Sequence, residues 1–363
     1  MEIVLCPIGP LQSEFCSYKL NIAGFNHGEC KTNITVAIIC QWVNRFIMKA
    51  VVVGASGLLG SAFARAAHRR GFELIGVSNK TELESKYFKE TLNFDLSNPE
   101  LLTEFLLDYW PDVIINTAAI SEPDVVDADP RYAAKLNIDL PRKLAQIASH
   151  LSACYFHPSS DMVFDGTERN YRPTAVPNPL TLYGEQKLNA EIEVLKYAAE
   201  HSVVLRLPLL NGNSLTGKRS MHEKVLWALS ENKKLDLFMD ELRQPCSVDN
   251  VAEVIVELSE RQDLRGLFHW GGKQLVSRYE IGKKIADRFC LSDELIAPTL
   301  SKDVLGLKAR PKKLELILSP LQGKLKTKPQ MFDDQLADLK IPDALYSWFR
   351  ENTRDPSCYV RRF

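Results

Sequence analysis

Short apolar runs alternate with longer amphipathic stretches over most of the chain from Met48 onward. Runs of this kind are typical of buried parallel strands. They predict strands at Lys49–Val53, Glu73–Val77, Thr91–Phe94, Val113–Asn116, Ala153–His157 and Val203–Leu207. The stretches between them predict helices at Leu58–Arg70, Pro99–Tyr109, Pro130–His150 and Leu182–Glu200. Repeated strand–helix units indicate an α/β fold with a doubly wound parallel sheet.

Composition narrows the function classes without naming one. The 363-residue chain is 45% hydrophobic and 25% charged, with a formal net charge of -1. This balance offers no basic surface for nucleic acid or an anionic membrane. No apolar run reaches the roughly 20 residues that a membrane helix needs. The eight cysteines contain no Cys-x-x-Cys pair, so we expect no metal site and a reducing, cytoplasmic location.

A glycine-rich turn, Gly54-Ala-Ser-Gly57-Leu-Leu-Gly60, directly follows the first predicted strand. Glycines at these positions let the backbone turn tightly and approach a pyrophosphate at the N-terminus of the next helix. Further polar residues stand where later strands end, namely Asp95, Asn116 and Ser159-Ser160. Because ligands of such sheets bind at the carboxyl ends of the strands, the pattern predicts a Rossmann-like dinucleotide site.

The domain organisation follows from where the alternation is strong and where it weakens. Residues 48–207 are predicted to form the NAD(P)-binding Rossmann domain, to which residues 236–262 return. Residues 208–235 and 263–333 are expected to build a smaller substrate-binding lobe, followed by a peripheral tail at residues 334–363. Residues 1–47 show no clear period, so we expect a poorly ordered N-terminal extension.

Tyr183 and Lys187 lie one helical turn apart on a predicted helix, and therefore on the same face. A lysine cation lowers the pKa of a neighbouring phenol, which then serves as a general acid toward the oxygen left by hydride addition. Ser160 is expected to hold the substrate carbonyl, with Ser159 as the alternative. We therefore predict Tyr183, Lys187 and Ser160 as the catalytic residues.

Two similar-looking features have structural explanations instead. Tyr279 and Lys283 repeat the same spacing, but they occur late in the chain and outside the predicted cofactor half. We interpret Tyr279 as a half-buried aromatic near a helix start. His157 ends an apolar strand and is expected to be a hydrogen-bonded core histidine rather than a proton relay.

The end of the second predicted strand bears on the choice of cofactor. It reads Val77-Ser78-Asn79-Lys80, without the carboxylate that would bind the ribose 2′-hydroxyl of NAD. A nearby cation favours NADP(H), with NAD(H) as the alternative. Asp95 is expected either to accept from the adenine amine or to cap the helix near Pro99. The predicted cofactor contacts share the carboxyl edge of the sheet and are Gly54, Ser56, Gly57, Leu58, Leu59, Gly60, Ser78, Asn79, Lys80, Asp95, Leu96, Thr117, Ala118, Ala119, Asn137, Tyr183 and Lys187.

The sequence resembles the extended short-chain dehydrogenases/reductases, and within them the dTDP-4-dehydrorhamnose reductases, from about Met48 to Leu316. The matching blocks include the glycine turn, Asn116-Thr-Ala-Ala119, Ser159-Ser-Asp-Met-Val-Phe164 and Tyr183-Gly-x-x-Lys187. The resemblance implies reduction of a dTDP-linked 4-keto-6-deoxy sugar by NADPH or NADH, as in dTDP-L-rhamnose biosynthesis. It assigns catalysis to Ser160, Tyr183 and Lys187. The implied partners are a nucleotide-sugar substrate and a second copy in a homodimer.

The same blocks are similar to the regulatory beta subunit of methionine adenosyltransferase, to which Val163-Phe-Asp-Gly166 and Arg310-Pro311 point. Leu209 stands where the reductases usually carry a tryptophan, and Cys246 stands where they carry a threonine after proline. One alternative is therefore a non-catalytic subunit that binds NADP and docks on methionine adenosyltransferase. A nucleotide-sugar epimerase or dehydratase is a further alternative, which the missing acid at Ser78 disfavours.

The cofactor assignment predicts the effect of reversing one charge. Lys80→Glu should weaken NADPH binding by at least about tenfold more than NADH binding, because only NADPH carries the 2′-phosphate that the cation would pair with. Fluorescence titration of the two cofactors measures both constants. Equal losses for the two cofactors would contradict the 2′-phosphate assignment.

Overall fold

The computed structural model describes residues 47–361, except 80, 82, 84, 305, 307 and 308. The predicted N-terminal extension therefore lies outside the described residues apart from Ile47, and so does Lys80. The described part forms one unit whose centre is a single large sheet.

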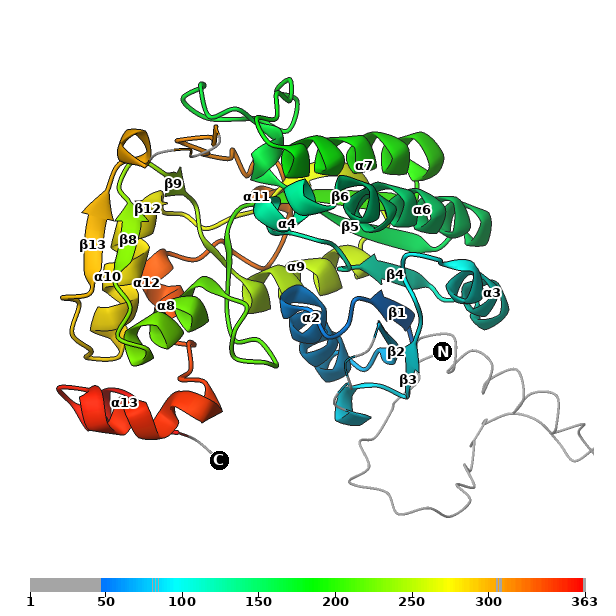
Figure 1. The fold of residues 1–363 in the computed structure, drawn as a ribbon. Coiled ribbons are helices and arrows are strands. Elements are labelled where there is room, and N and C mark those ends of the chain that lie inside the picture. Colours follow the sequence, from blue (N-terminus) through cyan, green and yellow to red (C-terminus); the bar gives the residue numbers. More distant parts are fainter. Residues whose placement is uncertain are drawn as a thin grey trace, which may run out of the picture. The chain divides into compact units, whose positions relative to one another are not determined.

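Seven parallel strands form this sheet in the order β11-β6-β5-β4-β1-β2-β3 (Figure 1). Their bounds are β1 (Lys49–Val53), β2 (Glu73–Ser78), β3 (Glu90–Asn93), β4 (Val113–Asn116), β5 (Cys154–Ser160), β6 (Ser202–Leu207) and β11 (Gly266–His269). The predicted α/β fold with a doubly wound parallel sheet is confirmed. The strand order reverses between β1 and β4, and Val53 lies opposite Asn116 in their register. Such a reversal is where sheets of this kind bind ligands.

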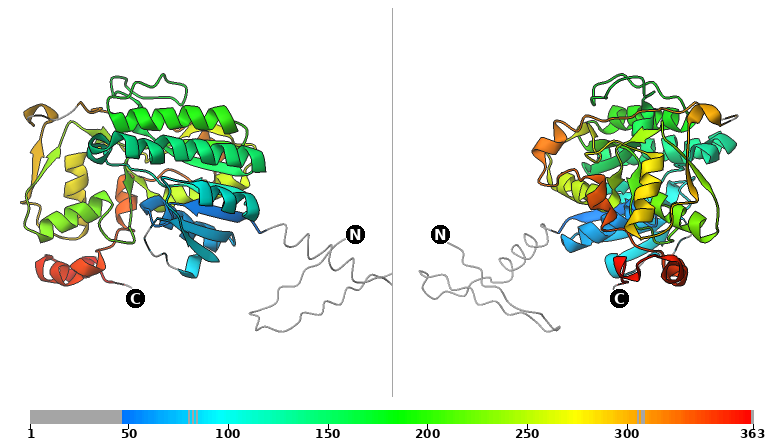
Figure 2. Two further views of the ribbon diagram at one scale, coloured as in Figure 1. Left: turned by 45° about the vertical axis from the view of Figure 1, so that its right-hand side comes forward. Right: turned by 90° about the vertical axis from the view of Figure 1, so that its left-hand side faces the viewer.

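Alternate side chains of β1 pack into two separate cores, because successive side chains of a strand point to opposite faces of the sheet. Ala50 and Val52 pack with α2 (Leu58–Arg69) and α9 (Val248–Glu260) on one face of the sheet. Val51 and Val53 pack on the other face with three more helices (Figure 2). These helices are α3 (Glu100–Tyr109), α6 (Leu140–Leu151) and α7 (Leu182–Ala198). The sheet is thus covered on both sides, which explains its continuous apolar runs.

The single continuous helix predicted over Pro130–His150 is wrong, because this segment is divided into three helical pieces. The chain instead forms α4 (Pro123–Ala128), α5 (Pro130–Ala134), a π-helical turn over Lys135–Asp139, and then α6. Pro141 has no N–H to donate to the carbonyl four residues earlier, so an unbroken α-helix would lose a bond there. The wider turn lies just before this proline, and turns of this type are frequent beside functional sites.

The C-terminal half forms a lobe around its own core. In this lobe β8 (Leu235–Phe238) pairs with β13 (Ile296–Thr299), beside α8 (Met221–Ser230) and α10 (Arg278–Arg288). The smaller elements are β7 (Leu210–Asn211), β9 (Leu242–Arg243), β10 (Cys246–Ser247), β12 (Val276–Ser277), α11 (Leu321–Lys324), α12 (Phe332–Leu336) and α13 (Tyr346–Asn352). Within the described residues, no helix combines the length and apolar character that crossing a bilayer demands.

Two features of this half differ from the prediction. The strand β11 falls in the segment assigned to the lobe, but it pairs with β6 and completes the main sheet. The tail beyond residue 333 is not peripheral, because Leu339, Leu345 and Phe349 are buried in the lobe core. The apolar residues of the tail are irregularly spaced, so no helical or strand period predicted that their side chains are buried in the core. The remaining domain boundaries stay a prediction.

The buried tail generates a stability prediction. Phe349 is fully buried, so Phe349→Ala should lower the free energy of unfolding by about 3–5 kcal/mol through lost burial and the cavity left behind. Val360→Ala is the matched control, because Val360 is 66% exposed and its truncation should change little. Urea unfolding of both variants measures the difference. Similar values for the two variants would mean that the tail does not support the lobe.

Candidate active site

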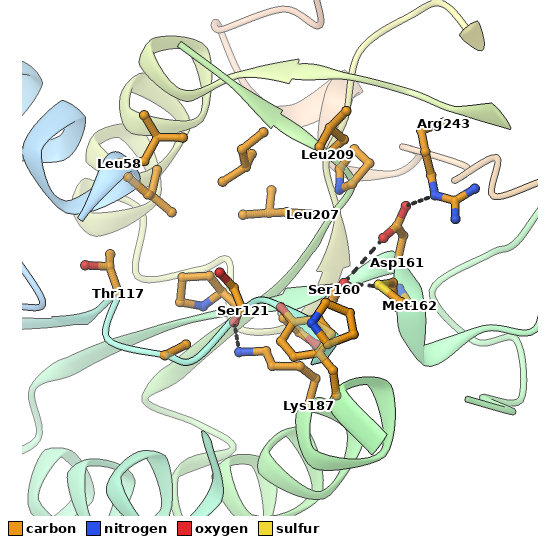
Figure 3. A pocket seen from close by; sticks show the side chains of 18 of the residues that line it. Leu58, Thr117, Ser121, Ser160, Asp161, Met162, Lys187, Leu207, Leu209 and Arg243 are labelled. Carbon is orange, nitrogen blue, oxygen red and sulfur yellow. Dashed lines mark hydrogen bonds and ion pairs between the residues drawn. The ribbon is translucent and has the colours of Figure 1, made fainter. Parts of the chain in front are cut away.

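A cavity of about 410 Å³ lies where β1, β4, β5 and β6 end, between the sheet and the lobe (Figure 3). The turns after these four strands supply much of its wall, and α7 supplies Tyr183 and Lys187. Residues of the lobe close the opposite side, among them Glu241, Arg243, Arg278 and Arg310. The cavity therefore joins the predicted dinucleotide site to the part of the chain expected to bind substrate.

The glycine turn packs closely against the end of β4. Gly54 has a φ of +83°, and a Cβ on it would lie 2.5 Å from the backbone nitrogen of Ala118. Only glycine fits this position without displacing backbone. Gly57 is the N-cap of α2 and has no side-chain cap. The helix N-terminus thus presents backbone N–H groups at the cavity edge, a donor set that suits a pyrophosphate.

The predicted cofactor residues divide into two groups. Those that line the cavity are Gly57, Leu58, Leu59, Thr117, Ala118, Ala119, Tyr183 and Lys187. Thr117 also closes the turn, because its hydroxyl lies 3.0 Å from the carbonyl oxygens of both Val53 and Gly54. The remaining described residues of the set, Gly54, Ser56, Gly60, Ser78, Asn79, Asp95, Leu96 and Asn137, do not line it.

Several members of the second group have other partners. Ser78 is 1% exposed, and its hydroxyl donates to the carbonyl of Thr81 at 2.6 Å. It is therefore not a free donor for a 2′-phosphate. Asp95 accepts from the backbone and hydroxyl of Ser97, at 2.9 and 2.7 Å. Asn137, in the π-helical turn, bonds both backbone groups of Ile120 and so holds the loop after β4.

Ser160, Tyr183 and Lys187 converge on one wall of the cavity from two separate segments. Thr181 caps α7 by accepting from the Gly184 N–H at 3.1 Å. A Cβ on Gly184 would lie 2.3 Å from the carbonyl oxygen of Met162, so glycine lets α7 begin directly against the turn after β5. This close approach places Tyr183 within hydrogen-bond reach of Ser160.

The electrostatics of this wall differ from the prediction. Burial raises the pKa of Tyr183 to about 12, the Ser160 hydrogen bond opposes the rise, and the charge of Asp161 adds to it. Burial also lowers the pKa of Lys187 to about 8, which Glu191 opposes. The ammonium of Lys187 donates to the Pro158 carbonyl at 2.6 Å. The expected lowering of the Tyr183 pKa by Lys187 is therefore wrong for this structure, because burial dominates.

The two adjacent serines have different surroundings. The hydroxyl of Ser159 donates to Glu191, whose carboxylate is bound by Arg206 at 2.9 and 2.7 Å. Ser160 accepts from the Met162 N–H at 3.1 Å, donates to Asp161 at 3.3 Å and faces Tyr183. The Ser159 hydroxyl is thus already bound to Glu191, whereas that of Ser160 lies beside the Tyr183 phenol.

His157 and Tyr279 were predicted to have structural roles. His157 is buried as expected, but neither ring nitrogen has a hydrogen-bond partner among the described residues. Burial, followed by the charge of Lys187, keeps its pKa well below the ordinary value, so the ring is neutral. Tyr279 lies on α10, packs partly buried against the lobe core and does not line the cavity.

The sequence did not reveal the charged residues on the lobe side of the cavity. Glu241 and Arg243 stand on either side of Leu242 at β9, Arg278 begins α10 and Asp161 follows β5, so only the folded chain brings these three segments together. The single available signal was that Asp161 directly follows Ser160. Among the described residues, no group of three or more metal-binding side chains gathers in one place.

Comparison with known proteins gives a family match and curated relatives. Residues 48–341 match the family model described as the RmlD substrate binding domain. Methionine adenosyltransferase 2 subunit beta of Xenopus laevis is 32% identical over 282 residues, which cover 76% of this chain and 81% of that protein. The probable low-salt glycan biosynthesis reductase Agl14 of Haloferax volcanii is 29% identical over 307 residues, covering 83% and 100% of the two chains.

Solved structures give the same picture of the fold. A hypothetical dTDP-4-dehydrorhamnose reductase from Sulfolobus tokodaii superposes with a TM-score of 0.69 at 28% identity, covering 81% of this chain and all of the other. The dTDP-4-dehydrorhamnose reductase of Bacillus anthracis, solved in complex with NADP, has a TM-score of 0.68 at 19% identity. That match covers 80% of this chain and 98% of the other.

The lowered pKa of Lys187 predicts a pH-dependent stability. The native state releases this proton at about pH 8, whereas the unfolded chain holds it to its ordinary pKa of 10.5. Between these values the unfolded state binds more protons, so the stability from this group rises as pH increases from 8 to 10.5 and is lost as pH falls back over the same range. The stability of the protein relative to Lys187→Met should therefore improve by about 2–3 kcal/mol from pH 7 to pH 10.

Urea unfolding of both proteins at the two pH values measures this change. The comparison with Lys187→Met cancels the titration of all other groups that the two proteins share. A difference in free energy that stays constant with pH would show that the lysine has an ordinary pKa in the native state.

Proposed function

Because the chain belongs to the RmlD substrate binding domain family, we propose that it reduces the keto group of a nucleotide-linked 4-keto-6-deoxy sugar, with NADPH as the hydride donor. The observation that carries the proposal is the convergence of Ser160, Tyr183 and Lys187 on a cavity that the glycine turn also lines. A hydroxyl, a phenol and an ammonium are the groups needed to hold a carbonyl and protonate its oxygen.

The described residues fit a dinucleotide. The close approach of Gly54 to Ala118 and the uncapped N-terminus of α2 at Gly57 suit a pyrophosphate. NADPH is favoured because Val77, Ser78 and Asn79, at the end of β2, include no carboxylate. The buried Ser78 hydroxyl leaves the 2′-phosphate contact to other groups, and NADH stays the alternative. When bound, the cofactor supplies the hydride that the carbonyl carbon accepts.

The side chains of this protein supply the proton that the carbonyl oxygen receives. Tyr183 carries its proton at neutral pH, because its pKa is raised to about 12. As the carbonyl carbon gains a C–H bond, the C=O π electrons move to oxygen and the Tyr183 hydroxyl gives that oxygen its proton. Ser160 orients the carbonyl through its hydroxyl. Lys187 is mostly charged at pH 7, since its pKa is about 8. From the same face of α7, its ammonium would hold a ribose hydroxyl of the cofactor.

The lobe side of the cavity supports a nucleotide-linked substrate. Arg278 and Arg310 line it, as does Arg243, whose terminal nitrogens are already bound by the carbonyls of Leu242, Pro311 and Lys312. Guanidinium groups match phosphate oxygens in geometry and charge, so they suit the diphosphate of a sugar nucleotide. Leu209 lines the cavity where an aromatic residue would pack on the sugar, which leaves the choice of sugar open to experiment.

The curated relatives favour a second candidate. The beta subunit of methionine adenosyltransferase 2 from Pongo abelii is 34% identical over 82% of this chain. On that basis the chain would bind NADP and act by docking on a methionine adenosyltransferase, with its site used for binding alone. Ser160, Tyr183 and Lys187 are compatible with both candidates, so turnover distinguishes them.

The reductase proposal predicts that Tyr183→Phe slows turnover by at least about 100-fold, the size of a general-acid contribution. The assay follows NADPH absorbance with dTDP-4-dehydro-6-deoxy-L-mannose as substrate. Tyr279→Phe is the matched control, because it removes a phenol from the same sequence spacing away from the cavity. It should leave the rate unchanged.

Two outcomes would count against the reductase. One is equal rates for Tyr183→Phe and the unchanged protein, which would remove the phenol from the chemistry. The other is no NADPH oxidation with any nucleotide-linked keto sugar, together with co-purification of a methionine adenosyltransferase, which would favour the regulatory candidate.

A further inference from the structure

Two cysteines that are distant in the sequence meet at the C-terminal end of α10. Cys290 directly follows Phe289, the C-cap of this helix, and Cys358 ends the short 3₁₀ helix Pro356–Cys358. The two thiols are hydrogen-bonded to each other, and both side chains are partly exposed to solvent. Neither residue lines the cavity, so the proposed function leaves this contact unexplained.

Backbone and side-chain hydrogen bonds hold the two segments together around these thiols. The Cys290 carbonyl accepts from the Arg354 N–H at 2.8 Å. The Cys358 carbonyl accepts from Arg288 Nη1, also at 2.8 Å. The Thr353 hydroxyl donates to the Cys290 carbonyl at 3.4 Å and lies 3.9 Å from Cys358 Sγ. The contact between the sulfur atoms is therefore set by the fold and not by two freely moving side chains.

The aromatic packing of the lobe supports the same arrangement. Phe289 and Tyr359, the sequence neighbours of the two cysteines, pack edge to face with ring centroids 5.6 Å apart. Phe349 of α13 packs against both rings, with centroids 6.3 and 5.8 Å away. In Figure 1 this C-terminal part of the chain, drawn in red, lies at the edge of the lobe. Core packing thus places the two thiols next to each other in the folded protein.

The two other cysteines that the structure describes are shielded. Cys154 and Cys246 belong to the core on one face of the sheet, where they are 8% and 1% exposed. Burial raises the pKa of both thiols, which keeps them in the unreactive protonated form. Burial and the neighbouring sulfur of Cys358 also raise the pKa of Cys290, but this thiol is partly exposed and already lies beside its partner. Accessibility and proximity therefore distinguish Cys290 and Cys358 from the other described cysteines.

We propose that Cys290 and Cys358 are a modification site, at which a small-molecule disulfide such as oxidised glutathione closes a disulfide bond between the lobe and the C-terminal segment. One protein thiolate attacks the S–S bond of the oxidant and releases a first small-molecule thiol. The second protein thiolate attacks the mixed disulfide, forms the Cys290–Cys358 bond and releases a second thiol. The protein thiols are oxidised by two electrons, and the disulfide of the oxidant is reduced to two thiols.

The new bond fastens the C-terminal segment to the lobe. The segment between the two cysteines includes α13, whose Phe349 is buried in the lobe core. A cross-link between residues so distant in sequence restricts the unfolded chain and thereby stabilises the folded one. In the reducing location that the sequence predicts, such a pair rests as two thiols and responds to oxidation. The proposal is independent of the proposed function, since it involves neither the substrate nor the cofactor.

Peptide mapping of the full chain tests the pair directly. The reduced, folded protein is incubated with glutathione disulfide, its remaining thiols are blocked with N-ethylmaleimide, and it is digested with trypsin. The expected product is a cross-link between peptides 289–302 and 355–361, each of which contains a single cysteine. Its mass is lower than the sum of the free peptides by the hydrogens of the two thiols. The same incubation in urea should give at least about tenfold less of this product, because unfolding removes the proximity of the thiols.

Three variants separate this disulfide from other thiol chemistry. Cys290→Gly removes one thiol and suits the φ of +51° at that position, which glycine adopts without steric cost. Cys358→Ser removes the other thiol. In each of these, glutathione bound to the remaining cysteine should increase at least about tenfold, because no neighbouring thiol displaces it. Cys154→Ala is the control, because it removes a thiol outside the pair and should leave the cross-link unchanged.

Urea unfolding measures the consequence for stability. The oxidised protein should unfold at a higher urea concentration than the reduced protein, and Cys290→Gly and Cys358→Ser should each abolish this difference. Cys154→Ala should retain it.

Three outcomes would overturn the proposal. One is full labelling of Cys290 and Cys358 by N-ethylmaleimide, or glutathione adducts alone on them, after oxidation of the folded protein. Another is a cross-link yield in urea that equals the yield in the folded protein, which would mean that the fold does not bring the thiols together. The third is a cross-link that leaves the unfolding midpoint unchanged. The mapping uses the unchanged protein, so it stays decisive even where a variant is unstable.

Discussion

A buried ion pair between Glu191 of α7 and Arg206 of β6 fixes the face that α7 turns toward the cavity. Both side chains are almost fully buried, with two bonds of 2.9 and 2.7 Å between them. Tyr183, Lys187 and Glu191 follow one another at four-residue intervals, so they share one side of the helix. Anchoring Glu191 therefore sets the direction of the other two. Loss of one partner from such a pair costs about 3–5 kcal/mol, so this orientation is strongly held.

The parts of the fold that the sequence could predict are those where burial leaves a simple pattern. The strand β1 is covered on both faces, so every residue is apolar after Lys49 and its bounds were predicted correctly. The strand β5 continues to Ser160, beyond the predicted end at His157, and the prediction stopped short because Ser159 and Ser160 are polar although they are buried. Polar side chains that line the cavity interrupt the hydrophobic pattern, so the pattern did not predict the end of the strand.

The parts that could not be predicted depend on contacts between distant segments. Spacing on one helix, together with a position in the predicted cofactor half of the chain, indicated Tyr183 and Lys187. Glu241 and Arg278 meet only because β9 and β12 pair, and neither short strand gives a sequence signal. Residue types also suggested that Lys187 sets the pKa of Tyr183, whereas burial raises that pKa in the folded chain. Burial is a property of the assembled lobe and sheet, so residue spacing does not report it.

The cavity combines a protonated phenol with two buried carboxylates whose arginine partners stay beyond hydrogen-bond distance, and this arrangement has a thermodynamic consequence. Asp161 and Glu241 each have one oxygen without a hydrogen bond among the described residues, so their ion pairs with Arg243 and Arg278 offset only part of the cost of burial. A ligand that donates to them stabilises the folded state in proportion to its binding. Asp161 belongs to the turn after β5 and Glu241 to the lobe. Ligand binding should therefore couple to the packing of the lobe against the sheet.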